Sequence, residues 1–184
     1  MSEFKAFISC SLRSQDARFV TFIERYLHQN GIEPFGTVGR HATSPQNPVE
    51  LMKENIEKSD FIVVCATKRY FQEDIHNKNQ KSAGISEMLQ FESGMAHASS
   101  KPLIVFVEEG VNMGSAIPNI TQYITVRKNG DRLAFQRKTA FGLLEKVKEQ
   151  CEENRSMEMF SGLGVLAVIG LAIYGGAKLL TGRI

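Results

Sequence analysis

Three short groups of residues in this sequence follow apolar segments and carry side chains suited to holding an anionic ligand. They are Ser9, Cys10, Ser11 and Arg13; Phe35, Thr37 and Arg40; and Arg69 and Tyr70. The first group also opens a predicted helix, and the free amides at a helix N-terminus favour an anion such as a phosphate. Hydroxyl groups at such positions equally serve as helix caps and turn residues, so the serines alone leave both interpretations open.

The apolar segments before these groups are predicted strands, and the amphipathic segments between them are predicted helices. The strands cover residues 4–10, 32–35, 61–66, 103–107 and 123–126, and the helices cover residues 15–30, 49–58, 86–99 and 132–154. This alternation, with the central strands apolar throughout, predicts an α/β fold: a flavodoxin-like parallel sheet of about five strands with helices on both faces. The ligand crevice of such a sheet lies beyond the carboxyl ends of its strands, where the three groups fall. Residues 74–84 are polar and are expected to be mobile.

Composition and charge exclude several kinds of function. The 184 residues are 42% hydrophobic and 23% charged, as in an ordinary globular protein. Lys and Arg number 22 against 20 Asp and Glu, which is too balanced for a nucleic-acid-binding protein. The glycine-rich motifs of dinucleotide and nucleoside triphosphate sites are absent from the sequence. The four histidines are dispersed and the three cysteines lack close spacing, so we expect no metal site and no resident cofactor.

The end of the sequence has a different character. Residues 159–177 contain no charged side chain, and Lys178 and Arg183 are the charged residues that follow. A helix over this segment spans roughly 28 Å, close to the hydrocarbon thickness of a bilayer. The alternative, a buried core helix, usually keeps a polar stripe, which this segment lacks. We therefore predict a single-pass transmembrane helix over residues 159–180, a connecting amphipathic helix over 131–158 and a domain over 1–130. With no secretory signal expected at the N-terminus, the bulk of the chain should be cytoplasmic.

With these elements placed, the sequence resembles the Toll/interleukin-1 receptor (TIR) domain superfamily, particularly its bacterial-type members. KAFISCS resembles the family's first strand and serine-rich turn, GIEPF its second strand, and IEKSDFIVVCATKRY its third strand with the lead-in. The most specific segment is SEMLQFESGMAHASSKPLIVFVEEG. It is similar to the family's helix, with a serine (here Ser86), an aromatic residue two positions on, a glutamate four positions later, then small residues and Lys-Pro. The resemblance covers residues 4–126 and implies a TIR-like form of the predicted sheet.

The resemblance also implies an activity. TIR enzymes cleave the bond between nicotinamide and ribose in NAD, giving ADP-ribose or a cyclic isomer, and Glu92 matches their catalytic glutamate. A carboxylate suits this reaction because the transition state resembles an oxocarbenium ion, whose developing positive charge a carboxylate stabilises. Nicotinamide leaves as a neutral molecule, so no strong general acid is required. The alternative for Glu92 is a solvated or ion-paired helix carboxylate. Glu87, in the first turn of the same helix, is expected to serve the helix end.

One residue departs from the family pattern. Met88 stands where the family commonly has Trp, so a stacking surface for nicotinamide is lost, although Tyr70 or Phe35 could substitute. The candidates for binding the pyrophosphate of NAD are Arg13, Arg40 and Arg69. Each guanidinium is a planar fork of donors that matches phosphate oxygens. Each could equally be a surface arginine beside an acidic residue.

Two other functions stay open. The same sheet and a glutamate late in the domain also resemble nucleoside 2-deoxyribosyltransferases, which cleave N-glycosidic bonds by attack of a carboxylate on the sugar; Glu92 is again the key residue. Alternatively, the domain is a non-catalytic assembly module, like many TIR domains, that senses a nucleotide and clusters the membrane helix. The resemblance further implies a homo-oligomer formed through the TIR-like domain and a signalling or antiphage defence role.

Overall fold

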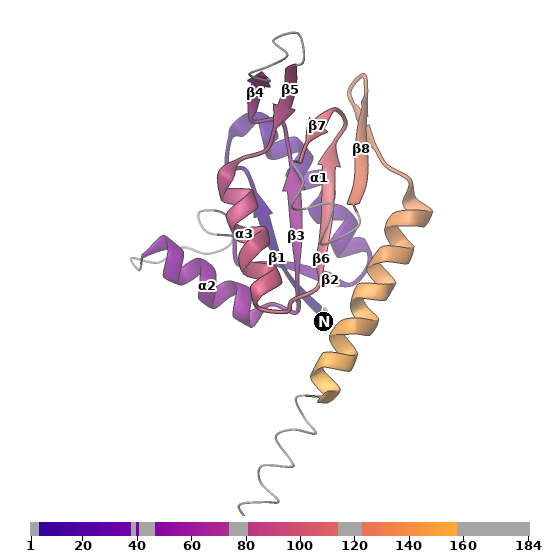
Figure 1. The fold of residues 1–184 in the computed structure, drawn as a ribbon. Coiled ribbons are helices and arrows are strands. Elements are labelled where there is room, and N and C mark those ends of the chain that lie inside the picture. Colours follow the sequence, from indigo (N-terminus) through magenta and orange to yellow (C-terminus); the bar gives the residue numbers. More distant parts are fainter. Residues whose placement is uncertain (1–3, 38–39, 41–46, 74–80, 114–122, 158–184) are drawn as a thin grey trace, which may run out of the picture. The chain divides into compact units, whose positions relative to one another are not determined.

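The computed structural model describes residues 4–37, 40, 47–73, 81–113 and 123–157 (Figure 1). The chain divides into two compact units, residues 1–148 and 149–184, and the sheet and cavity discussed below belong to the first. The predicted transmembrane helix over residues 159–180 lies outside the described residues. Within the described part of the chain, no helix combines the length and the apolar character that crossing a membrane requires.

Five parallel strands form the main sheet, in the order β2-β1-β3-β6-β8, and a short sixth strand, β9, pairs antiparallel with β8 at one edge. The strands are β1 (Phe4–Cys10), β2 (Ile32–Phe35), β3 (Phe61–Ala66), β6 (Leu103–Glu108), β8 (Tyr123–Asn129) and β9 (Arg132–Ala134). This is the order of flavodoxin-like sheets, in which the direction of winding reverses between β1 and β3. The predicted parallel α/β sheet is confirmed, with an antiparallel edge added.

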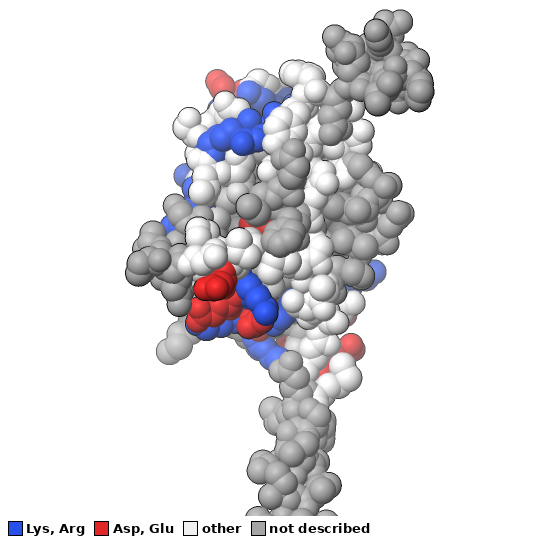
Figure 2. All heavy atoms as spheres, turned by 60° about the vertical axis from the view of Figure 1, so that its left-hand side comes forward, with Lys and Arg blue, Asp and Glu red and all other residues white. Residues whose placement is uncertain are grey.

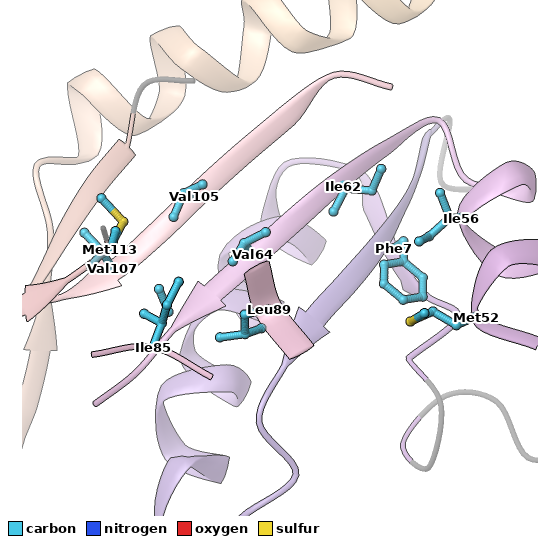
Figure 3. Packing of buried hydrophobic residues seen from close by; sticks show 11 residues of the cluster. Phe7, Met52, Ile56, Ile62, Val64, Ile85, Leu89, Val105, Val107 and Met113 are labelled. Atoms are coloured by element: carbon cyan, nitrogen blue, oxygen red, sulfur yellow. The ribbon is translucent and has the colours of Figure 1, made fainter. Parts of the chain in front are cut away.

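Helices cover both faces of this sheet, as predicted. They are α1 (Ala17–Gln29), α2 (Pro48–Lys58), α3 (Glu87–Ala98) and, within the first unit, the helical residues 137–148. This last helix continues to residue 157 in the second unit. On one face, Met52 of α2 and Leu89 of α3 belong to a single buried cluster with Phe7 of β1 and Val64 of β3, and Met52 lies beside Phe7 (Figure 3). On the opposite face, Tyr26 of α1 packs edge-on against Phe106 of β6, with ring centroids 6.0 Å apart. Because both faces are covered, β3 is buried along its whole length, which explains its unbroken apolar sequence.

Local hydrogen bonds fix the start of α2, which borders the cavity. The Asn47 side chain accepts a hydrogen bond from the amide of Val49 at 3.0 Å, and Pro48 takes the first helical position, where no amide hydrogen is needed. Further along α2, Asn55 Nδ2 donates to the carbonyl oxygen of Gly36 at 3.0 Å. Gly36 has a φ of +76°, and a Cβ there would lie 2.8 Å from the Cβ of Asn55. The backbone after β2 therefore approaches α2 at a position that requires glycine.

Three further strands form a small second sheet beyond the carboxyl ends of the main strands (Figure 1). β4 (Tyr70–Glu73) pairs antiparallel with β5 (Lys81–Gly84), and β5 pairs in parallel with β7 (Val111–Asn112). No strand was predicted within the polar segment 74–84, so the strand over residues 81–84 was missed. These residues form a strand through backbone pairing, although their side chains show no strand-like apolar pattern. Residues 74–80 lie outside the described part of the chain.

The last predicted helix was wrong at its start. Residues 132–134 form β9 and pair with residues 127–129 of β8, so the helix begins at residue 137 instead of residue 132. The turn between the two strands contains Gly130 with a φ of +56°, a backbone conformation that glycine adopts without strain. β8 is correspondingly longer than the predicted strand over residues 123–126.

Candidate active site

A cavity of about 530 Å³ opens at the carboxyl ends of β1 and β3, where the winding of the sheet reverses. Its walls come from the chain after β1, the first two turns of α2, the segment between β3 and β4, and α3 with the residue before it. The described lining residues are Cys10, Ser11, Leu12, Arg13, Pro48, Val49, Met52, Arg69, Ser86, Leu89 and Glu92. The volume falls within the range of about 300–1,000 Å³ that is usual for small-molecule sites.

Glu92 is the carboxylate among the described lining residues, and it is held by a side chain from the neighbouring strand. Ser9 Oγ donates a hydrogen bond to Glu92 Oε2. Ser9 lies on the face of β1 that α3 covers, because it is two residues from Phe7, a member of the cluster beneath α2 and α3. The bond therefore ties α3 to the central strand at the cavity wall and orients the carboxylate.

The environment of Glu92 favours its neutral form. Burial raises the pKa of Glu92 from 4.5 to about 7, because the charged carboxylate loses water that the protein does not fully replace. The hydrogen bond from Ser9 acts in the opposite direction and lowers the pKa, since it stabilises the charged form. Glu92 can therefore exchange a proton near neutral pH, as catalytic carboxylates commonly do.

The spacing along α3 brings one stripe of residues to the cavity. Ser86, Leu89 and Glu92 follow one another at intervals of three residues and all line it. Ser86 is the residue before the helix, and its carbonyl accepts the amide of Gln90. The pattern S-x-x-x-x-x-E that carried the family resemblance thus places its serine and its glutamate in the same wall. The side chains of Glu87 and Met88 are outside the described set, so the predicted roles of these two residues stay predictions.

Two of the three predicted anion-binding arginines line the cavity, but they differ in their contacts. Arg13 forms an ion pair with Asp16 at 2.7 Å, and its guanidinium also donates to the carbonyl oxygen of Lys68 at 2.7 Å. Arg69 contacts the ring of Tyr70, with its guanidinium carbon 5.8 Å from the ring centroid. Figure 2 shows Lys and Arg side chains gathered at the upper end of the molecule, the end toward which the parallel strands point in Figure 1.

Five predicted site residues are absent from the described lining: Ser9, which contacts Glu92 as described above, and the four that follow. Arg40 is fastened instead to α1, where Nε and Nη2 donate to the two carboxylate oxygens of Glu24 at 2.8 and 2.5 Å. Thr37 is buried and its hydroxyl donates to the carbonyl oxygen of Ile8, so it holds the chain after β2 against β1. The other two are Phe35, whose ring lies under the ammonium group of Lys5, and Tyr70. The prediction that these four residues bind substrate stays a prediction, because their absence from the described lining does not test it.

Cys10 lines the cavity but is poorly suited to act as a nucleophile. Burial raises its pKa to about 12, and the nearby Arg40 offsets only part of this effect. The neighbouring Cys65, which pairs with Cys10 in the register of β1 and β3, is buried and its pKa is also raised by burial. Both cysteines are free thiols. Since the thiolate is the reactive form, covalent cysteine chemistry is disfavoured here.

The apolar part of the site was not predicted from the sequence. Leu12 and Val49 line the cavity while 60% and 49% exposed, and Met52 and Leu89 line it from the buried cluster. Exposed apolar side chains at a cavity are suited to the flat face of an aromatic ring. Their signal in the sequence is weak, because an apolar residue at a strand end or a helix start is most often part of the core. Among the described residues, no group of His, Cys, Asp and Glu is arranged to hold a metal ion.

Comparison with known proteins gives distant likenesses. No family model and no curated protein matches the sequence. One similar solved structure is the Clostridium botulinum CMP N-glycosidase BcmB, with 16% identity and a TM-score of 0.43, covering 68% of this chain and 89% of that one. Another is the solution structure of BlsM, with 18% identity and a TM-score of 0.39, covering 60% of this chain and 69% of that one. The resemblance to TIR domains stays an expectation from the sequence.

Proposed function

We propose that this protein cleaves an N-glycosidic bond of a nucleotide, with Glu92 as the catalytic carboxylate. The observation that carries the proposal is the Ser9–Glu92 pair in the wall of a cavity at the winding reversal of the sheet, with the pKa of Glu92 raised to about 7. Open α/β sheets bind ligands at this place, and a carboxyl group poised near neutral pH suits catalysis.

In the proposed reaction the bond between C1′ of the sugar and the base nitrogen breaks, and the bonding electron pair leaves with the base. Positive charge develops on the sugar, and the ionised carboxylate of Glu92 stabilises it. Ser9 occupies Oε2 as a hydrogen-bond donor, so Oε1 is the oxygen available to the sugar. Water then adds its oxygen to C1′ and releases a proton. The exposed apolar side chains of Leu12 and Val49 offer a surface for the leaving base.

Two substrate classes fit this chemistry, and they differ in what the leaving group needs. A pyrimidine or purine base leaves well when it is protonated, and the acid form of Glu92 is a source of that proton near pH 7. The nicotinamide of NAD leaves as a neutral molecule without protonation. The second class is favoured by one observation: Glu92 is the one carboxylate among the described lining residues, so a separate acid and base are not both present there.

The test is product analysis with matched variants. Wild-type protein is incubated with CMP, other nucleoside monophosphates and NAD, and released bases and nicotinamide are measured by liquid chromatography and mass spectrometry. Glu92→Gln keeps the shape and its acceptor for Ser9 but removes the charge, and it should lower the rate by about 10²–10³-fold. Glu57→Gln, on the exposed side of α2, is the control and should retain full activity.

The pH dependence separates the two classes. Cleavage of NAD requires ionised Glu92 and should rise as the pH increases through about 7, whereas proton donation to a base should weaken over the same range. Full turnover by Glu92→Gln would refute the proposal. So would the absence of base and nicotinamide release from artificially clustered wild-type protein, a result that would favour the assembly module.

A further inference from the structure

We propose that Arg69 binds a phosphate group of the substrate, so that the cavity accepts nucleotides and discriminates against nucleosides. The inference rests on the proposed function, and it names a specificity residue within the same site. The shared chemistry is a phosphate ester on the ribose, which a nucleoside monophosphate and the dinucleotide NAD both carry.

The two cavity arginines differ in how much of their charge is already neutralised. Arg13 is bound to the carboxylate of Asp16 through both Nη2 and Nε, which lie 2.7 and 2.8 Å from Asp16 Oδ2. The Lys68 carbonyl and the Ser11 hydroxyl take further hydrogen bonds from Arg13, at 2.7 and 3.2 Å. Arg13 therefore serves to join the turn after β1 to the segment after β3, and few of its donors are left for a ligand.

Arg69 has no such partner among the described residues. The guanidinium of Arg69 lies over the face of the Tyr70 ring. This cation–π contact uses none of the hydrogen-bond donors of the guanidinium. The planar fork of N–H groups thus stays available, and this geometry matches two phosphate oxygens at once. The side chain is exposed and lines the cavity, so an anion can reach it without burial of an unpaired charge.

The backbone around Arg69 is fixed even though its side chain is exposed. The amide of Arg69 donates to the carbonyl oxygen of Gly84 in β5 at 2.8 Å, and the amide of Lys68 donates to a carboxylate oxygen of Glu108 at 3.1 Å. Thr67, the residue that follows β3, is buried. Because the backbone at the cavity rim is already held, binding has to order the side chain of Arg69 but not the segment that carries it, which lowers the entropic cost of binding.

The charge balance of the lining supports an anionic ligand. Arg13 is offset by Asp16, and burial keeps part of Glu92 neutral at pH 7. The positive charge of Arg69 is therefore not cancelled by a described lining residue. A phosphate bound to Arg69 would lie at the exposed rim of the cavity. It would therefore not compete with the sugar for the space beside the buried carboxylate of Glu92.

The test measures binding apart from turnover. Full-length Glu92→Gln protein in mild detergent is titrated by calorimetry with CMP, cytidine, NAD and nicotinamide riboside. We expect each phosphate-bearing ligand to bind more tightly than its nucleoside. Adding Arg69→Gln should weaken CMP and NAD binding by about 10- to 100-fold, the usual range for a charge-assisted hydrogen bond, and should leave the nucleosides nearly unchanged. Arg69→Lys keeps the charge without the fork and should fall between.

Lys68→Gln is the matched control, because it removes one positive charge from the adjacent residue, which does not line the cavity. It should change nucleotide binding by less than about threefold. The proposal is overturned if Arg69→Gln weakens nucleotides and nucleosides equally, if Lys68→Gln has the same effect as Arg69→Gln, or if neither CMP nor NAD binds at millimolar concentration. Arg69-dependent binding without turnover by the wild-type protein would instead refute the hydrolase and leave the phosphate subsite standing.

Discussion

Replacing Glu92 with glutamine should make the protein more stable at neutral and alkaline pH while it lowers activity. In the folded protein the pKa of Glu92 is about 7, compared with 4.5 for an unperturbed glutamate. Folding therefore favours the protonated form, and this stabilisation is complete below pH 4.5 and is lost as the pH rises through about 7. The difference between a pKa of about 7 and one of 4.5, at about 1.4 kcal/mol per pH unit, amounts to about 3–4 kcal/mol.

The assay is urea unfolding of wild type and Glu92→Gln, followed by circular dichroism because the chain has no tryptophan. Between pH 4.5 and 7 the wild type should lose stability relative to Glu92→Gln by about 1.4 kcal/mol per pH unit, and the difference should level off above pH 7. Other titrating groups cancel in this comparison. Glu57→Gln, in which an exposed carboxylate is replaced, should show no comparable trend. A Glu92→Gln difference that does not change with pH would mean that Glu92 is not buried as the structure shows, and the reasoning about its pKa would fail.

Four more outcomes are expected. Ser9→Ala removes the hydrogen bond that lowers the pKa of Glu92, so the pH midpoint of activity that depends on the ionised form should move upward in a pH–rate profile. Gly36→Ala places a residue with a side chain at a φ of +76°, and the new Cβ would lie 2.8 Å from the Cβ of Asn55 in α2. Both effects destabilise the fold, so the free energy of unfolding measured in urea should fall by about 1–3 kcal/mol. Replacing Leu166 and Ile169 with arginine should release the chain from membranes in carbonate extraction, because each central arginine costs about 2.5–3.5 kcal/mol; recovery of the unaltered chain in the supernatant would contradict the predicted anchor. If the domain assembles as the resemblance to TIR enzymes implies, specific activity should rise when the protein is clustered on vesicles, and activity independent of concentration would count against assembly.

The parallel sheet was predictable because its strands are buried on both faces and their sequences are therefore apolar throughout. β3 shows this best, with all six residues buried. The hairpin of β4 and β5 was not predictable, because residues 81–84 are joined to their neighbours by backbone hydrogen bonds that any sequence can make. The start of the last helix was misplaced for a similar reason. Residues 132–134 satisfy a helical pattern locally, but pairing with β8 determines their conformation.

The site was predictable where chain connectivity alone brings residues together. Ser9 and Cys10 end β1, Ser11 follows it, and Arg69 follows β3. Because β1 and β3 are parallel neighbours, the topology brings these residues to the same edge of the sheet. Arg40 shows the limit of this reasoning. It follows β2 in the sequence, but Glu24 on α1 offers it a bidentate partner, and no sequence pattern reveals that pairing. The family pattern, and not the periodicity, pointed to Glu92, and its contact with Ser9 joins segments 83 residues apart.

Burial of Glu92 links the stability of the fold to the proposed chemistry. The ionised form of Glu92 is the costly one, because burial removes water from the carboxylate and a single hydrogen bond from Ser9 replaces it. A sugar that develops positive charge beside Oε1 would supply the missing partner, and in a site with little water that attraction is stronger than in bulk solution. The interaction is therefore small with the neutral sugar of the ground state and large with the positively charged sugar of the transition state, which is the difference that accelerates a reaction. Variants of the cavity that admit more water to Glu92 should then lower its pKa, increase stability at high pH and reduce the rate together, since all three depend on the same loss of solvation.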